Sequence, residues 1–288
     1  MSSSKLIIFG FPLLLVACGA AGAVLARNTL HVERHSRPNR GQTVSIAAAD
    51  GAVLRASWAA PDDGFARCVM ILHGVGDSRG SAMGFAPMFL HHGYAVLAPD
   101  SRAHGESGGD LLTYGIVEKF DTLAWARWMR SNGCEKIYGL GESMGGSILL
   151  QAEAQAPAFQ AIVAESAFAD IQEAAELRLQ RMLPMPRALS APLAWIAAVN
   201  GRCYMRLVYG FDIAEASPLR VMPKLRTPTL LIHGTADDQT PPDHSQRLAA
   251  ANPKMTELWL VDGAHHTGAY ARQPGEFEHR VLAWFAQH

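Results

Sequence analysis

Short apolar runs recur along the chain and are separated by longer stretches in which apolar residues return at helical spacing. Runs such as VMIL and TLLI contain no polar position, as expected for strands that are buried on both faces of a parallel sheet. We therefore predict strands at Val53–Ala59, Cys68–His73, Ala95–Pro99, Lys136–Gly141, Ala161–Glu165, Thr229–His233 and Thr256–Val261.

Amphipathic helices are predicted between these strands, so strand and helix alternate. This order predicts an α/β domain with a mostly parallel central sheet flanked by helices. Residues 167–218 have a helical composition interrupted by prolines, and we interpret them as a small helical lid insertion. The residues predicted to face the core are Val117, Phe120, Ala124 and Trp128 in one helix, and Phe277, Val281, Leu282 and Phe285 in another.

The N-terminal pattern differs, because Leu6–Ala26 carries no charge and is long enough to cross a bilayer as a helix. The run fits an uncleaved transmembrane anchor or a cleaved signal peptide. It also fits a lipoprotein signal, because the sequence LVAC ending at Cys18 resembles the bacterial lipobox, whose cysteine is acylated. We predict a signal or membrane-anchor segment at 1–30, a polar linker at 31–42 and the main domain at 43–288.

The orientation of this segment is ambiguous. Four arginines between Arg27 and Arg40 follow the run and only Lys5 precedes it, which favours a cytoplasmic main domain. Both signal-peptide interpretations place that domain outside the cytoplasm. We expect membrane association through the N-terminal anchor or a lipidated Cys18, with the main domain extracytoplasmic.

Composition and net charge restrict the kinds of partner that the protein can bind. Apolar residues make up 49% of the chain, charged residues 18%, and the net charge is −1, which is typical of a globular domain and gives no basic excess for nucleic acid. The cysteines show neither CxxC nor zinc-type spacing, so we expect no metal and no disulfide framework. We interpret Cys68 and Cys134, which flank predicted strands, as buried thiols.

The strongest chemical signal is the sequence GESMGG at 141–146, between an apolar strand and a predicted helix. A sharp strand-to-helix turn strains the backbone of Ser143, so residues two positions away on either side, Gly141 and Gly145, must lack side chains. The turn presents the Ser143 hydroxyl at the carboxyl edge of the sheet. We therefore predict Ser143 as a nucleophile.

A serine hydroxyl needs a general base and an acid that orients the base. Asp237 and Asp238 follow one predicted strand, and His265 and His266 follow the next, in the order Ser, Asp, His. Spacing alone does not choose within either pair.

An oxyanion hole needs two backbone N–H groups that point at the developing charge. We assign one to Met144, directly after the nucleophile, and the other to Val75, in the loop after the strand CVMILH. His73 in the same loop is interpreted as a residue that shapes the loop.

Five ordered motifs, HGVGDSR, PDSRAHGESGG, GESMGG, HGTADDQTPP and GAHHTGAY, resemble the α/β-hydrolase superfamily. Within it the chain is similar to the serine-aminopeptidase-like and BEM46-like hydrolases, from about Thr43 to the C-terminus. The resemblance implies an α/β-hydrolase fold and selects Asp237 and His266. It makes the turn containing His104 structural, and here Ala103 replaces the usual glycine.

The resemblance and the triad together imply hydrolysis of a small-molecule acyl substrate, most simply a carboxylic ester, without metal or organic cofactor. An aminopeptidase or amidase, or an acyltransferase, would use the same residues. A more remote alternative is a non-catalytic, membrane-tethered binding protein. Natural substrate and oligomeric state do not follow from the sequence.

Overall fold

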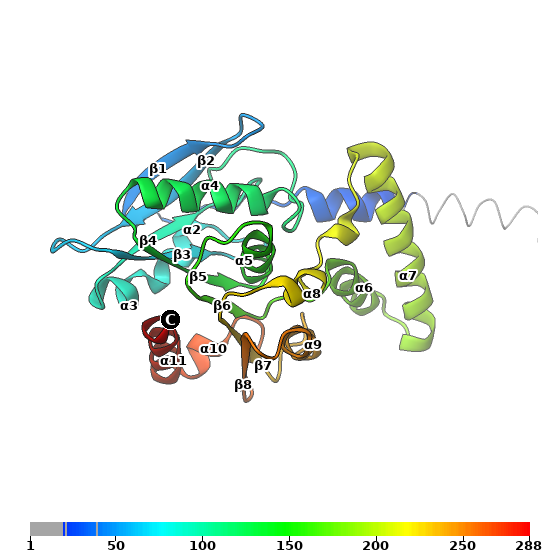
Figure 1. The fold of residues 1–288 in the computed structure, drawn as a ribbon. Helices are drawn as coiled ribbons and strands as arrows, with labels where there is room; N and C mark the ends of the chain where they lie inside the picture. Colours follow the sequence, from blue (N-terminus) through cyan, green and yellow to red (C-terminus); the bar gives the residue numbers. More distant parts are fainter. Residues whose placement is uncertain (1–19, 21, 39) are drawn as a thin grey trace, which may run out of the picture. The chain divides into compact units, whose positions relative to one another are not determined.

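The structure is a computed structural model that describes residues 20, 22–38 and 40–288 (Figure 1). The chain divides into two compact units. The larger unit combines Val32–Asp170 with Ala216–His288, and the smaller unit combines Met1–His31 with Ile171–Glu215.

The larger unit is built on an eight-stranded sheet in the order β1-β2-β4-β3-β5-β6-β7-β8. β1 and β2 pair antiparallel, β2 pairs antiparallel with β4, and the remaining pairs are parallel, which confirms the predicted mostly parallel sheet. The strands are β1 (Gln42–Ala47), β2 (Val53–Ala59), β3 (Arg67–Leu72), β4 (Tyr94–Pro99), β5 (Lys136–Glu142), β6 (Ile162–Glu165), β7 (Thr229–Gly234) and β8 (Thr256–Val261).

Helices cover both faces of this sheet (Figure 1). α5 packs on β5 and β6, and α4 packs on α5. On the other face, Phe89 and Phe285 stack at 5.9 Å in the core between α3 and α11. The helices of this unit are α2 (Arg79–Ala82), η1 (Met83–Phe85), α3 (Ala86–His91), α4 (Glu118–Ser131), α5 (Met144–Gln155), α8 (Pro218–Val221), η4 (Met222–Lys224), α9 (Asp243–Ala251), α10 (Ala269–Arg272) and α11 (Pro274–Gln287).

The predicted core face is right for α11 and wrong for α4. Phe277, Val281 and Phe285 are buried as expected, whereas Phe120 of α4 is 47% exposed. α4 instead buries a face that contains Glu118 and Asp121. Glu118 accepts backbone N–H groups of the preceding loop, and Asp121 pairs with a buried arginine. A prediction based on hydrophobicity places such carboxylates at the surface, whereas here they are buried.

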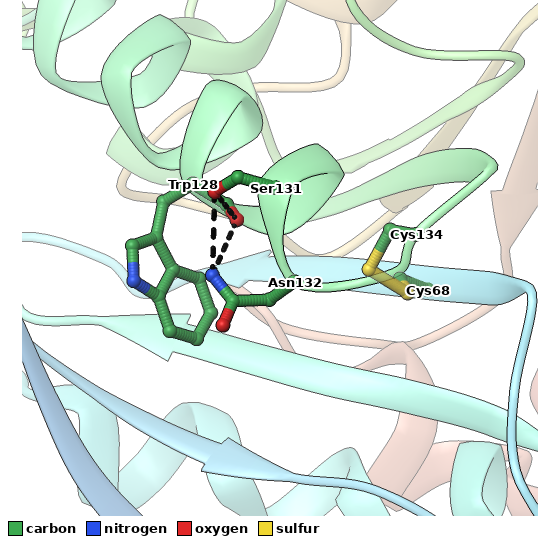
Figure 2. Close-up of a disulfide and its surroundings, with 5 residues drawn as sticks. All are labelled: Cys68, Trp128, Ser131, Asn132 and Cys134. Atoms are coloured by element: carbon green, nitrogen blue, oxygen red, sulfur yellow. Dashed lines mark hydrogen bonds between the residues drawn. A yellow bond between two sulfur atoms is a disulfide. The ribbon is translucent and has the colours of Figure 1, made fainter.

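Cys68 and Cys134 form a disulfide, which corrects the expectation of two separate thiols (Figure 2). α4 ends in a Schellman turn: Gly133 is left-handed (φ 98°), and the Cys134 N–H donates to the carbonyl of Met129. This turn leads into β5, which pairs in parallel with β3. The two cysteines therefore come from neighbouring strand starts that lie 66 residues apart in sequence.

The smaller unit is helical in its described part. Its elements are α6 (Ile171–Met182), α7 (Arg187–Tyr204), the π-helical turn η2 (Met205–Tyr209), η3 (Ile213–Glu215) and an N-terminal helix at residues 22–30. The N-terminal helix packs so closely on α7 that a Cβ added at Gly22 would lie 2.5 Å from Asn200 Cβ.

Most of the apolar run Leu6–Ala26, including Cys18, lies outside the described residues. Within the described part, no helix has both the length and the apolar character needed to cross a bilayer. Residues 32–38 and 40–41 of the predicted linker have no regular secondary structure, but Arg34 donates to the carbonyls of Ser107 and Gly109.

Candidate active site

Ser143 occupies a strained turn between β5 and α5, with φ 51° and ψ −114°. A Cβ at Gly141 would lie 2.4 Å from the Gly146 nitrogen, and one at Gly145 would lie 2.2 Å from the Leu72 carbonyl oxygen. Both distances are too short for any side chain. The two glycines are therefore required for the reason predicted from the sequence.

His266 lies between Ser143 and Asp237. Its Nε2 is 2.8 Å from the Ser143 Oγ, and its Nδ1 is 2.8 Å from the Asp237 Oδ2. In the matching tautomer the serine hydroxyl donates to Nε2 and the Nδ1–H donates to the carboxylate. The three side chains come from the ends of β5, β7 and β8, and they form one continuous hydrogen-bonded chain.

The neighbouring residues that sequence spacing left open lie elsewhere. Asp238 is exposed. The His265 Nδ1 lies 3.1 Å from the carbonyl oxygen of Ala236. Within the described residues, neither Asp238 nor His265 forms a hydrogen bond with Ser143. The geometry thus brings together the pair that the family resemblance selects.

The Asp237 carboxylate is buried and extensively hydrogen-bonded. Burial raises its pKa, but bonds with His233 and His266 and the N–H of Thr240 outweigh that effect and hold the pKa well below its ordinary value. His233 is fixed in turn by Ser245 and by the carbonyl of Thr240. Asp237 is therefore ionised at neutral pH and held ready to orient His266.

The end of β6 supports both the nucleophile and the histidine loop. The Ser143 N–H donates to the Glu165 carbonyl oxygen at 2.7 Å. The Glu165 Oε1 accepts the Ala269 N–H at 2.8 Å, and the Ser166 Oγ accepts the Thr267 N–H at 3.2 Å. Sequence analysis missed Glu165 and Ser166, because neither stands in a motif and their position follows from β6 lying between β5 and β7.

Two carboxyl groups, the half-buried Glu142 and the buried Glu165, lie on neighbouring strands next to Ser143. Glu142 and Glu165 are register partners on β5 and β6. Burial, followed by repulsion from Glu165, raises the pKa of Glu142 to about 8. Burial raises the pKa of Glu165 to about 7, although the Ala269 N–H and His266 oppose the shift. Both groups hold protons in the neutral range.

The loop after β3 approaches the nucleophile as expected for an oxyanion hole. A Cβ at Gly74 would lie 3.5 Å from the Ser143 Cβ, so the backbone just before Val75 borders the serine. The His73 Nε2 accepts the Ser101 N–H, and the His104 Nε2 accepts the Gly76 N–H. Both histidines are buried and hold loops in place, in agreement with their predicted structural roles.

The turn after β4 is organised by the buried Asp100. It accepts the Arg79 N–H and its guanidinium, and also the Glu106 N–H. Ala103 is left-handed at φ 60°, which explains why the related motif has glycine there. The turn supports the loop after β3 and contributes no side chain to the hydrogen-bonded chain of Ser143, His266 and Asp237. No metal-binding cluster of His, Cys, Asp or Glu occurs in the part of the chain that is described.

Comparisons with known proteins show the family of this chain. Residues 69–280 match the alpha/beta hydrolase family. The chain is 30% identical to the uncharacterized protein YqkD of Bacillus subtilis, over 79% of this chain and 73% of that protein. It is 24% identical to the monoglyceride lipase of Rattus norvegicus, over 76% and 81% of the two chains.

The fold is shared with solved structures as well. An esterase of Pyrococcus furiosus superposes with a TM-score of 0.73 at 23% identity, covering 89% of this chain and 98% of the esterase. The matched family region contains Ser143, Asp237 and His266. The protein therefore belongs to the alpha/beta hydrolase family and is a hydrolase.

Proposed function

We propose that this hydrolase cleaves a carboxylic ester of a small molecule through a Ser143–His266–Asp237 triad and an acyl-enzyme. One observation carries the proposal: His266 lies 2.8 Å from both the serine oxygen and the aspartate oxygen. A general base must be within hydrogen-bond reach of the proton that it removes, and this one is.

In the proposed mechanism, the His266 Nε2 takes the hydroxyl proton as the Ser143 Oγ attacks the substrate carbonyl. The N–H groups of Val75 and Met144 donate to the oxyanion of the tetrahedral intermediate. The ionised Asp237 stabilises the imidazolium, which then gives its proton to the leaving alcohol. Water, deprotonated by the same histidine, releases the acid from the acyl-enzyme. No metal or organic cofactor enters this scheme.

An ester is preferred over an amide because the named relatives include an esterase and monoglyceride lipases, although a puromycin-hydrolyzing peptidase of Mycobacterium tuberculosis shares the fold as well. An aminopeptidase or amidase, or an acyltransferase, remains the alternative, since each uses the same three side chains. A non-catalytic, membrane-tethered binding role is disfavoured because all three triad positions are occupied and hydrogen-bonded.

We also propose that the larger unit works outside the cytoplasm, tethered by the N-terminal segment. The Cys68–Cys134 disulfide supports this location, because such bridges persist in oxidising compartments and are rare in the cytosol.

The triad is tested by turnover of p-nitrophenyl esters of graded chain length beside aminoacyl amides. We expect Ser143→Ala and His266→Ala to lose at least about a thousandfold in kcat, whereas the matched control His265→Ala retains most activity. Ester turnover should exceed amide turnover. A folded Ser143→Ala variant with near-normal activity would refute the mechanism, and faster amide cleavage would favour the aminopeptidase alternative.

A further inference from the structure

Large apolar side chains on the surface are concentrated in the smaller unit. In the larger unit Val53, Val75, Phe120 and Leu260 are exposed, and the other exposed large apolar residues of the described chain belong to the smaller unit. Leu207 is 87% and Met182 is 72% exposed there. We define the exposed apolar surface by Met182, Leu189, Leu193, Trp195, Leu207 and Val208.

α7 has its small residues inside and its large residues outside. Ser190, Ala194, Ala198 and Gly201 are the buried residues of this helix. Leu189, Leu193 and Trp195 are between 42% and 60% exposed. A helix at an ordinary water-exposed surface has the reverse arrangement, with large apolar residues facing the core.

The middle of this region is basic, although Glu173, Glu176, Asp212 and Glu215 lie at its two ends. Between Leu177 and Phe211 the sequence contains five arginines and neither aspartate nor glutamate. Arg202 pairs with Asp212. Arg206 lies 3.8 Å from the same carboxylate. Arg178, Arg181 and Arg187 are exposed and flank the apolar residues on α6 and α7. Exposed leucine and tryptophan bordered by arginine are typical of helices that lie in the interface of an anionic bilayer.

The same unit contains the end of the most apolar run of the sequence. Gly22, Ala26 and Leu30 form the buried face of the N-terminal helix. A Cβ at Gly201 of α7 would lie 3.2 Å from the carbonyl oxygen of Gly22. The uncharged run Leu6–Ala26 therefore ends in a helix that packs directly on α7, which places α7 close to any bilayer that receives the run.

We infer that the exposed apolar surface of α6, α7 and η2 is a second membrane-contact site, which docks on an anionic phospholipid surface beside the N-terminal segment. The apolar side chains enter the interface, and the flanking arginines bind lipid phosphates. A bilayer is a better occupant than a protein partner because the same unit contains the end of the long apolar run Leu6–Ala26, and because no acidic residue lies between Arg178 and Arg206 in the sequence. The inference does not depend on the triad.

The test places an environment-sensitive fluorophore at Leu193→Cys in the full chain, with Cys18→Ser and Cys203→Ser as background. The matched control carries the same fluorophore at Phe120→Cys, an exposed apolar position on α4 of the larger unit. Each protein is mixed with phosphatidylcholine vesicles with and without phosphatidylglycerol. We expect the label at 193 to shift to shorter wavelength and to be quenched by lipid-borne nitroxide, most strongly with phosphatidylglycerol. The label at position 120 should show neither the wavelength shift nor the quenching.

Arginine variants test the electrostatic part of the inference. Arg181→Gln and Arg187→Gln should each weaken the vesicle affinity reported at 193 by about fivefold, while the circular dichroism spectrum stays unchanged. Three results would overturn the inference: equal responses at 193 and 120, no sedimentation with anionic vesicles, or a lipid-independent shift at 193 that grows with protein concentration. The last result would assign the surface to a second copy of the chain.

Discussion

Glu142 and Glu165 hold protons at pH values where surface carboxyls are ionised, and this has a consequence for stability. The pKa of Glu165 rises from 4.5 to about 7 on folding, so between these values the folded chain binds more protons than the unfolded chain. The stabilisation is complete below about pH 4.5 and is lost as the pH rises through about 7. Glu142, whose pKa is raised to about 8, adds a loss of stability that continues up to about pH 8.

We therefore expect the free energy of unfolding to fall by on the order of 3 kcal/mol between about pH 5 and about pH 8. Glu165→Gln should flatten this slope, because the amide has no proton to lose. Glu276→Gln, at an exposed ion pair on α11, is the matched control and should leave the slope unchanged. Urea unfolding across this range measures the effect, and a wild-type slope of opposite sign would contradict the raised pKa values.

Sequence predicted individual site residues where a local constraint fixes the residue type. Ser143 was found because its neighbours must be glycine. Strand order led only to the pairs Asp237/Asp238 and His265/His266, and the family resemblance selected Asp237 and His266 within them. His233 and Glu165 carry no such mark. His233 contacts Asp237 across the turn that follows β7, whereas Glu165 reaches Ser143 only because β5 and β6 are neighbours, a pairing that a local pattern does not encode.

The disulfide acts at the scale of elements, by joining the start of β3 to the turn between α4 and β5 (Figure 2). It closes a loop of 66 residues. In the chain-entropy view a bridge over such a loop stabilises the fold by about 4 kcal/mol, because it restricts the unfolded chain. We expect the Cys68→Ala/Cys134→Ala variant to lose about this much.

The midpoint of urea unfolding, with and without a thiol reductant, measures this loss. Reductant should lower the midpoint of the wild-type protein and leave the double variant unchanged. Cys203→Ser is the control, because Cys203 is exposed and outside the bridge. A wild-type midpoint that ignores reductant, in protein shown to be reduced, would mean that the bridge contributes nothing.

Strands and helices could be predicted from the sequence where their buried residues are apolar. The seven strands expected from apolar runs are present, whereas β1 was missed because it is an edge strand whose residues are half-buried or exposed. The face of α4 was misjudged because buried Glu118 and Asp121 satisfy loop N–H groups and Arg102. The bridge was missed because cysteine spacing does not report that β3 and β5 pair.

At the scale of the whole molecule, the N-terminal helix bears on how the chain is processed. Cleavage after Ala26 would remove Gly22 and Ala26, two of the three residues on the buried face of this helix. Gly22 lies against Asn200 and Gly201 of α7, where only glycine fits. The packing therefore favours forms that keep residue 22: an uncleaved anchor, or a lipoprotein that begins at Cys18.

We expect the mature protein to retain Gly22 and to sediment with membranes. Intact mass of membrane-extracted protein tests this, because the lipoprotein form lacks residues 1–17 and carries acyl groups on Cys18, whereas the anchor form does neither. A chain that begins at Cys18 and carries acyl groups identifies the lipoprotein, and Cys18→Ser should then abolish processing. A full-length chain with a free Cys18 thiol identifies the anchor, in which Cys18→Ser changes nothing because serine is tolerated in a membrane helix. A soluble chain that starts after Ala26 would contradict both forms, and it would mean that Gly201 of α7 loses the packing of Gly22 against it in the mature protein.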